Sequence, residues 1–102
     1  MTNSTTLYAA RTADGLRIWC QHPYDPLECE VVVDEKSGSI RLTRRAACVR
    51  AATLVARELL MLARASRQEQ LELLPDLISW LQNGKEGESH DAVRHEAAPD
   101  EA

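Results

Sequence analysis

The chain has 102 residues, a net charge of −4 and no Phe. This length fits one domain with a single modest core, which Leu, Val, Ile and Ala must fill. Because small side chains bury little apolar area each, we expect an oligomer interface to complete the core.

Charge is segregated along the chain. Seven Arg and one acid, Glu58, lie between residues 40 and 67, whereas residues 68–102 carry nine acids and two bases. A basic centre of this kind either neutralises the acidic end of the chain or faces an acidic partner. The polar N-terminus and the odd count of three Cys predict a cytoplasmic protein with free thiols and no membrane association.

Four strands are predicted in the first half of the chain. Residues 7–11 and 16–21 flank a turn containing Asp14-Gly15, and residues 28–34 and 39–43 flank a polar turn that ends in Gly38. The connector between the two hairpins contains two Pro and is not a strand. Alternation places one apolar set on the inner face of the sheet: Leu7, Ala9, Leu16, Ile18, Cys20, Cys29, Val31, Val33, Ile40 and Leu42.

Two helices are predicted in the second half. Residues 46–65 lack Gly and Pro and are apolar around most of the helix, which begins near Thr43 as its N-cap. Ser66 and Glu69 fit a capping box, so that either a second helix begins there or the first continues with a bend. Asn83-Gly84 ends the helical pattern, and residues 85–102 read as a disordered acidic tail.

These elements define an α+β fold of order ββββαα. Two hairpins form a four-stranded antiparallel sheet, and a long helix and a shorter one pack on one face of it within a single domain of residues 1–84. We expect a homodimer, since the symmetric dimer is the commonest oligomer. The residues predicted at its interface are Leu59, Leu62, Leu77, Trp80 and Leu81.

The sequence does not favour an enzyme. Nucleophilic catalysis needs a Ser or Cys beside a base, and two of the three His fall in the predicted tail. No phosphate loop, nucleophile elbow or dinucleotide fingerprint is present, and no cofactor is implied. Cys20, His22 and Cys29 could approach one another, but they match no zinc module, and buried thiols are the preferred interpretation.

Two surfaces are candidates for partner binding. The outer face of the sheet is predicted to carry Tyr8, Arg17, Trp19 and Arg41, which are residue types enriched in binding hot spots. Tyr24 in the connector is a further candidate contact. The second surface is a stripe on the long helix, where a spacing of seven places Arg50, Arg57 and Arg64 on one side.

Two functions fit these patterns. The first is a small non-enzymatic protein-binding module, an adaptor or inhibitor that occludes a macromolecular partner, as phage and mobile-element inhibitors of host machinery do. That comparison is an analogy of class. The alternative is a nucleic-acid-binding regulator that lays the Arg stripe along phosphates. The acidic net charge argues against the alternative.

Overall fold

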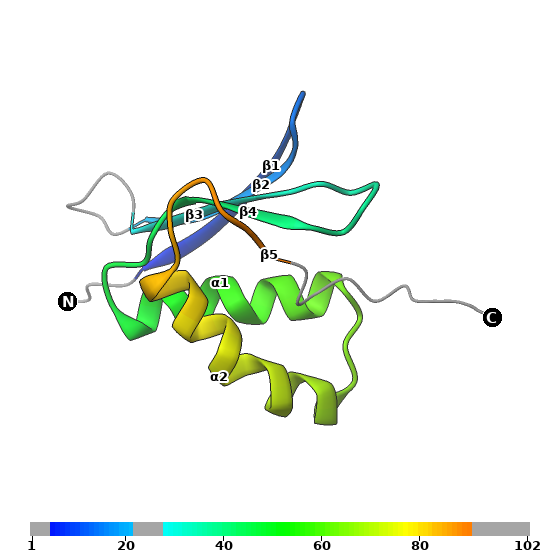
Figure 1. The fold of residues 1–102 in the computed structure, drawn as a ribbon, viewed down its shortest axis with the longest axis vertical. Helices are drawn as coiled ribbons and strands as arrows, with labels where there is room; N and C mark the ends of the chain where they lie inside the picture. The colour runs from blue at the N-terminus through cyan, green and yellow to red at the C-terminus, as the bar shows by residue number, and fades with distance from the viewer. Residues whose placement is uncertain (1–4, 22–27, 91–102) are drawn as a thin grey trace.

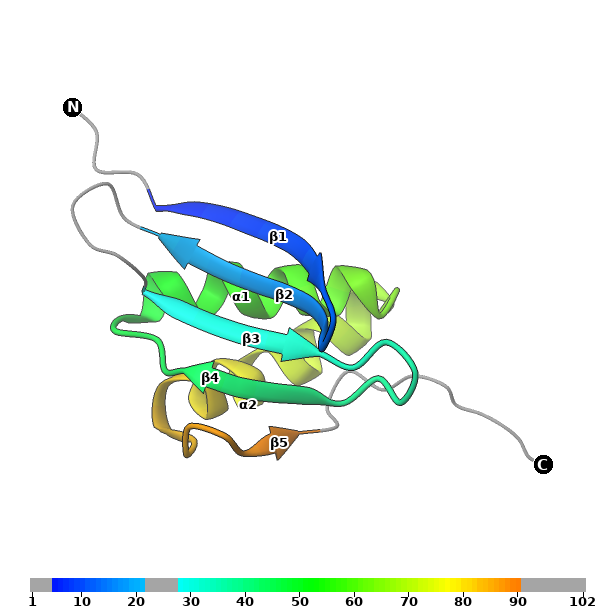
Figure 2. The same ribbon diagram turned by 90° about the horizontal axis from the view of Figure 1, so that it is seen from above.

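A computed structural model describes residues 5–21 and 28–90 of the chain. It contains one antiparallel sheet in which the strands follow one another in sequence order, as Figure 2 shows from the side that the helices leave open. The strands are β1 (Thr6–Thr12), β2 (Gly15–Gln21), β3 (Cys29–Val33), β4 (Ile40–Arg44) and β5 (Ser89–His90).

Both helices lie on one face of this sheet (Figure 1). They are α1 (Val49–Leu62) and α2 (Arg67–Asn83), and α1 packs directly against β2 and β3. The predicted α+β fold is confirmed, with a short fifth strand added at the edge of the sheet. Within the described part of the chain, neither helix has the length and apolarity needed to cross a bilayer.

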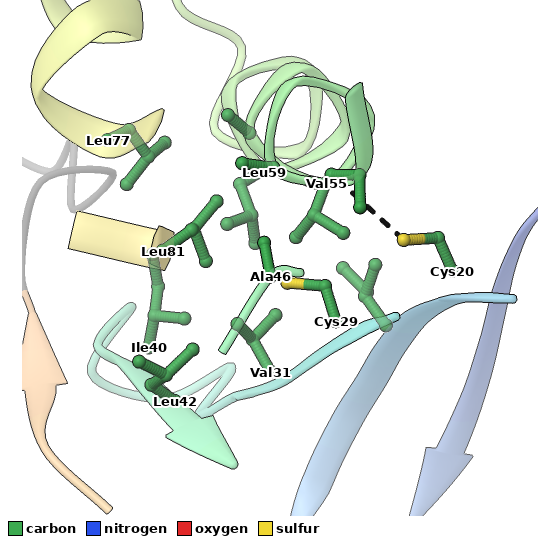
Figure 3. Close-up of a cluster of buried hydrophobic side chains, with 14 of the residues drawn as sticks. Cys20, Cys29, Val31, Ile40, Leu42, Ala46, Val55, Leu59, Leu77 and Leu81 are labelled. Carbon is green, nitrogen blue, oxygen red and sulfur yellow. Dashed lines mark hydrogen bonds between the residues drawn. The ribbon is translucent and has the colours of Figure 1, made fainter. Parts of the chain in front are cut away.

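The core lies between α1, α2 and the inner face of the sheet (Figure 3). The predicted alternation is correct for the central strands, since Ile18, Cys20 and Val31 are fully buried. Several of the buried side chains of α1 are small, with Ala51, Ala52 and Ala56 fully buried, and this lets the helix approach the sheet closely. No aromatic ring is needed to fill the space.

Three of the residues predicted at a dimer interface belong to this core. Leu59 is 1% exposed and Leu77 and Leu81 are fully buried within the single chain, so they have no surface to offer to a second copy. Their apolar spacing therefore reflects packing of the two helices on the sheet. Leu62 is exposed and Trp80 is partly buried.

The predicted start of the first helix is wrong. Thr43 and Arg44 belong to β4, and the N-cap of α1 is Cys48. The intervening backbone bonds to other elements: the amide of Ala46 donates to the Leu81 carbonyl at 2.8 Å, and that of Ala47 donates to the Glu28 carbonyl at 3.1 Å. These tertiary bonds hold residues with high helix propensity in a non-helical link.

The predicted capping box at the start of α2 is confirmed. The Ser66 hydroxyl accepts from the Glu69 amide at 3.1 Å, and the Glu69 carboxylate accepts from the Ser66 amide at 2.8 Å. Of the two predicted alternatives, the structure has a separate second helix and not a bent continuation of the first. Pro75 lies inside α2, which continues through it to Asn83.

The turn between the helices depends on Arg64, which adopts a left-handed backbone conformation with φ of 57°. The amide of Ala65 donates to the Leu60 carbonyl and that of Arg64 donates to the Met61 carbonyl, both at 3.0 Å. This pattern is a Schellman motif, in which Gly usually occupies the position of Arg64. Because this position is Arg and not Gly, the sequence contains no local signal for the end of α1.

The chain just after α2 also differs from expectation. The sequence predicts a disordered tail from Lys85, but Ser89–His90 pairs with β4, and Leu42 exchanges backbone hydrogen bonds with Gly87 and Glu88. The His90 ring lies 4.8 Å from the Trp80 ring, so this segment covers part of the indole. The remainder of the predicted tail, residues 91–102, lies outside the described residues.

We predict that Arg64→Gly raises the free energy of unfolding by about 1 kcal/mol, because Gly removes the steric cost of the left-handed conformation. Arg57→Gly is the matched control, since it places Gly inside α1 and is expected to lower stability by about 1 kcal/mol. Urea denaturation followed by circular dichroism measures both changes. A loss of stability in Arg64→Gly would contradict the role assigned to this turn.

Candidate partner-binding face of the sheet

The helices leave the outer face of the sheet uncovered (Figure 1). Strand register orders its side chains in two rows that run across the strands. The first row, across β1 to β4, is Tyr8, Trp19, Glu30 and Arg44. The second row, across β2 to β5, is Arg17, Val32, Arg41 and Ser89.

An ordered cluster centres on Trp19. Tyr8 pairs with Trp19 across β1 and β2, and the two rings stack with centroids 5.4 Å apart and planes 18° apart. The Arg17 guanidinium lies over the Trp19 ring, 4.1 Å from its centroid, and its Nε donates to Glu30 of β3. Trp19 is therefore contacted from β1 by an aromatic ring and by a cation that is anchored to β3.

The cluster has an apolar floor. Val32 belongs to the outer set by alternation, yet it is only 9% exposed. Arg17 and Arg41 flank it in the strand register, and the stems of long Arg side chains cover apolar neighbours while their charged ends stay in water. Tyr8 remains 44% exposed at the β1 edge.

Three of the predicted contact residues, Tyr8, Arg17 and Trp19, lie together in the structure. Arg41 lies on the same face, in β4, where it pairs with Val32 of β3. Tyr24 lies outside the described residues. Arg50 and Arg57 are exposed on α1, in the layer on the other side of the sheet, so they belong to a separate surface. Arg64 follows the end of α1, which interrupts the predicted helical stripe.

Sequence reasoning missed Arg44 as a member of this face. Regular alternation puts Arg41 and Arg44 on opposite faces, but the register shifts between Glu30 and Val31, which pair with Arg44 and Leu42. Thr43 is thus an extra residue on β4, a β-bulge, and its hydroxyl donates to the Glu30 carbonyl at 3.0 Å. No simple sequence signal marks a bulge here.

The three thiols gather at another place, where β2 and β3 meet the start of α1. Cys20 and Cys29 face each other across the strands, and the Cys20 thiol donates to the Ala51 carbonyl at 3.7 Å (Figure 3). Burial raises the pKa of the Cys20 thiol and of the Cys29 thiol to about 12. Both thiols are therefore protonated and poorly nucleophilic at neutral pH.

Cys48 is the exposed thiol of this corner. It donates to Glu28, whose side chain is buried and also accepts from the Thr5 hydroxyl at 3.0 Å. His22 lies outside the described residues. Among the residues that are described, no group of three or more His, Cys, Asp or Glu is arranged to hold a metal ion.

Among the described residues, the fold is a small α+β domain with one aromatic and basic sheet surface that neither helix covers. No family model matches the chain, and neither the curated proteins nor the solved structures searched contain a match.

We predict that a maleimide labels only Cys48 in the native protein at neutral pH, and all three Cys after denaturation. Peptide mass spectrometry identifies the labelled sites. Equal labelling of Cys20 or Cys29 in the native state would contradict the burial of these thiols.

The same burial predicts a loss of stability in alkali. Because the folded state holds these protons more tightly, its stability is complete below the ordinary thiol pKa of 9.0 and falls as the pH rises towards about 12. Cys20→Ala provides the control for denaturation measured across this range, and it should show a smaller alkaline loss. An equal loss in the variant would assign the effect to other groups.

Proposed function

We propose that this chain is a small non-enzymatic protein-binding module, an adaptor or inhibitor that covers a macromolecular partner with the outer face of its sheet. The observation that carries the proposal is the ordered cluster of Tyr8, Trp19 and Arg17 on an uncovered face. Trp, Tyr and Arg dominate binding hot spots. Side chains that are already ordered lose less conformational entropy when a partner docks.

Other features support the same proposal. The two buried thiols are held protonated, which makes them poor nucleophiles for catalysis. Cys20, Cys29 and Cys48 are unbridged, in keeping with a module of the reducing cytoplasm. The comparison with phage and mobile-element inhibitors remains an analogy of class.

The alternative function, nucleic-acid binding through the helical Arg stripe, has weaker support. A stripe along phosphates needs its cations on one continuous face. Arg50 and Arg57 lie on α1, but Arg64 occupies the turn after it and has a left-handed backbone. The sheet face offers the more ordered set of contact residues.

Partner capture tests the proposal. The tagged chain is used to capture proteins from the native host, and bound proteins are quantified by mass spectrometry for wild type, Trp19→Ala and Arg57→Ala. We expect Trp19→Ala to reduce capture of the specific partner by at least about tenfold, as removal of a hot spot does. Arg57→Ala, on the opposite layer, should retain capture.

Thermal melts of the same variants separate binding from stability, since loss of the stacked rings and the cation over Trp19 costs only about 1–2 kcal/mol. Folded Trp19→Ala with unchanged capture would show that the cluster only stabilises the sheet, and the proposal would then fail.

A homodimer remains a prediction, now limited to the exposed end of α1. Met61 is 63% and Leu62 46% exposed, and Leu62 lines an apolar pocket of about 230 Å³ between the helix and the sheet. We expect Leu62→Asp to convert a dimer into a monomer in light-scattering measurements. A wild-type mass of one chain at all concentrations would contradict the dimer.

A further inference from the structure

The bulge in β4 gathers two arginines on the bare face. Because Thr43 is the extra residue, Arg44 pairs with Glu30 and Arg41 pairs with Val32, so both belong to the rows that face away from the helices. Bulges are enriched beside functional sites, where they redirect a side chain. Here the redirected side chain is Arg44.

These arginines lack a full complement of acids. Glu30 lies opposite Arg44, but its Oε2 already accepts from the Arg17 Nε. In the described ranges, 5–21 and 28–90, no carboxylate forms an ion pair with Arg41 or Arg44. The two rows therefore contain three arginines and one carboxylate, and this face is positive although the chain as a whole carries −4.

We propose that the partner docks an acidic protein segment on this face, with its carboxylates bound by Arg41 and Arg44, which lie one strand beyond the neighbours of Trp19. Charge complementarity selects the occupant, since carboxylates match the planar fork of each guanidinium. This inference rests on the proposed function and adds the chemistry of the partner.

A protein segment fits better than a nucleic acid. Binding of single strands uses open aromatic faces on which bases stack. The Trp19 ring is instead engaged by Tyr8, which stacks at 5.4 Å, and by the Arg17 guanidinium at 4.1 Å. Two exposed arginines without an open ring between them favour carboxylates over stacked nucleotides.

The direct test uses a fluorescein-labelled peptide of alternating Glu and Ser, with binding followed by fluorescence anisotropy at low salt. We expect Arg41→Glu and Arg44→Glu each to weaken binding about tenfold. Arg57→Glu is the matched control, with the same charge change on the opposite layer, and should weaken it much less. Binding should decline as salt is added.

Three results would overturn the inference. The first is equal weakening by Arg57→Glu, which indicates attraction by net charge alone. The second is tighter binding of a labelled single-stranded RNA that also depends on Arg41 and Arg44. The third is no binding of the acidic peptide by folded wild-type protein.

Partner capture with the same variants separates this inference from the proposed function. If Trp19→Ala loses the partner while Arg41→Glu and Arg44→Glu retain it, the inference of an acidic segment is wrong and the proposed function stands. If all three folded variants retain it, the sheet face is not the binding surface and both fail. Circular dichroism confirms that each variant is folded.

Discussion

One-sided packing of the helices on the sheet is the constraint on which the rest of the structure depends. Helix α1 lies across β2 and β3 with Ala51, Ala52 and Val55 fully buried, and α2 closes the core with Leu77 and Leu81. Small side chains let the helix approach the strands closely, so a chain without Phe still fills its interior. The buried apolar residues of the strands point to this one face, apart from Val32.

The opposite face is thereby left to other residues, and their arrangement follows from strand pairing. Adjacent strands place Tyr8 beside Trp19 and Trp19 beside Glu30, which is the acceptor that holds Arg17 over the indole. The cluster is thus a product of sheet register. The bulge at Thr43 adds Arg44 to the same face, whose two rows then hold three arginines and one carboxylate, a charge opposite in sign to that of the whole chain.

Most of the fold was predictable from local patterns. Alternation in the strands, the hairpin turn just before Gly15 and the capping box at Ser66 each act over a few residues, and all three appear in the structure. The candidate face was predictable in part, since alternation identified Tyr8, Arg17, Trp19 and Arg41. It could not identify Arg44, because a bulge changes the face of every residue that follows it.

The sequence by itself determined the number of strands before the helices, the inner face of the sheet and the capping box at Ser66, because period and capping are properties of neighbouring residues. Only the structure showed that a second helix begins at this capping box. Tertiary structure decided where α1 begins and ends. Bonds from Ala46 to Leu81 and from Ala47 to Glu28 hold the chain out of the helix, and Arg64 takes a left-handed turn that its side chain does not favour. The tertiary structure also placed Leu59 in the core of a single chain. Apolar spacing alone could not predict this, because a helix shows the same spacing whether it packs on a sheet or on a second copy of the chain.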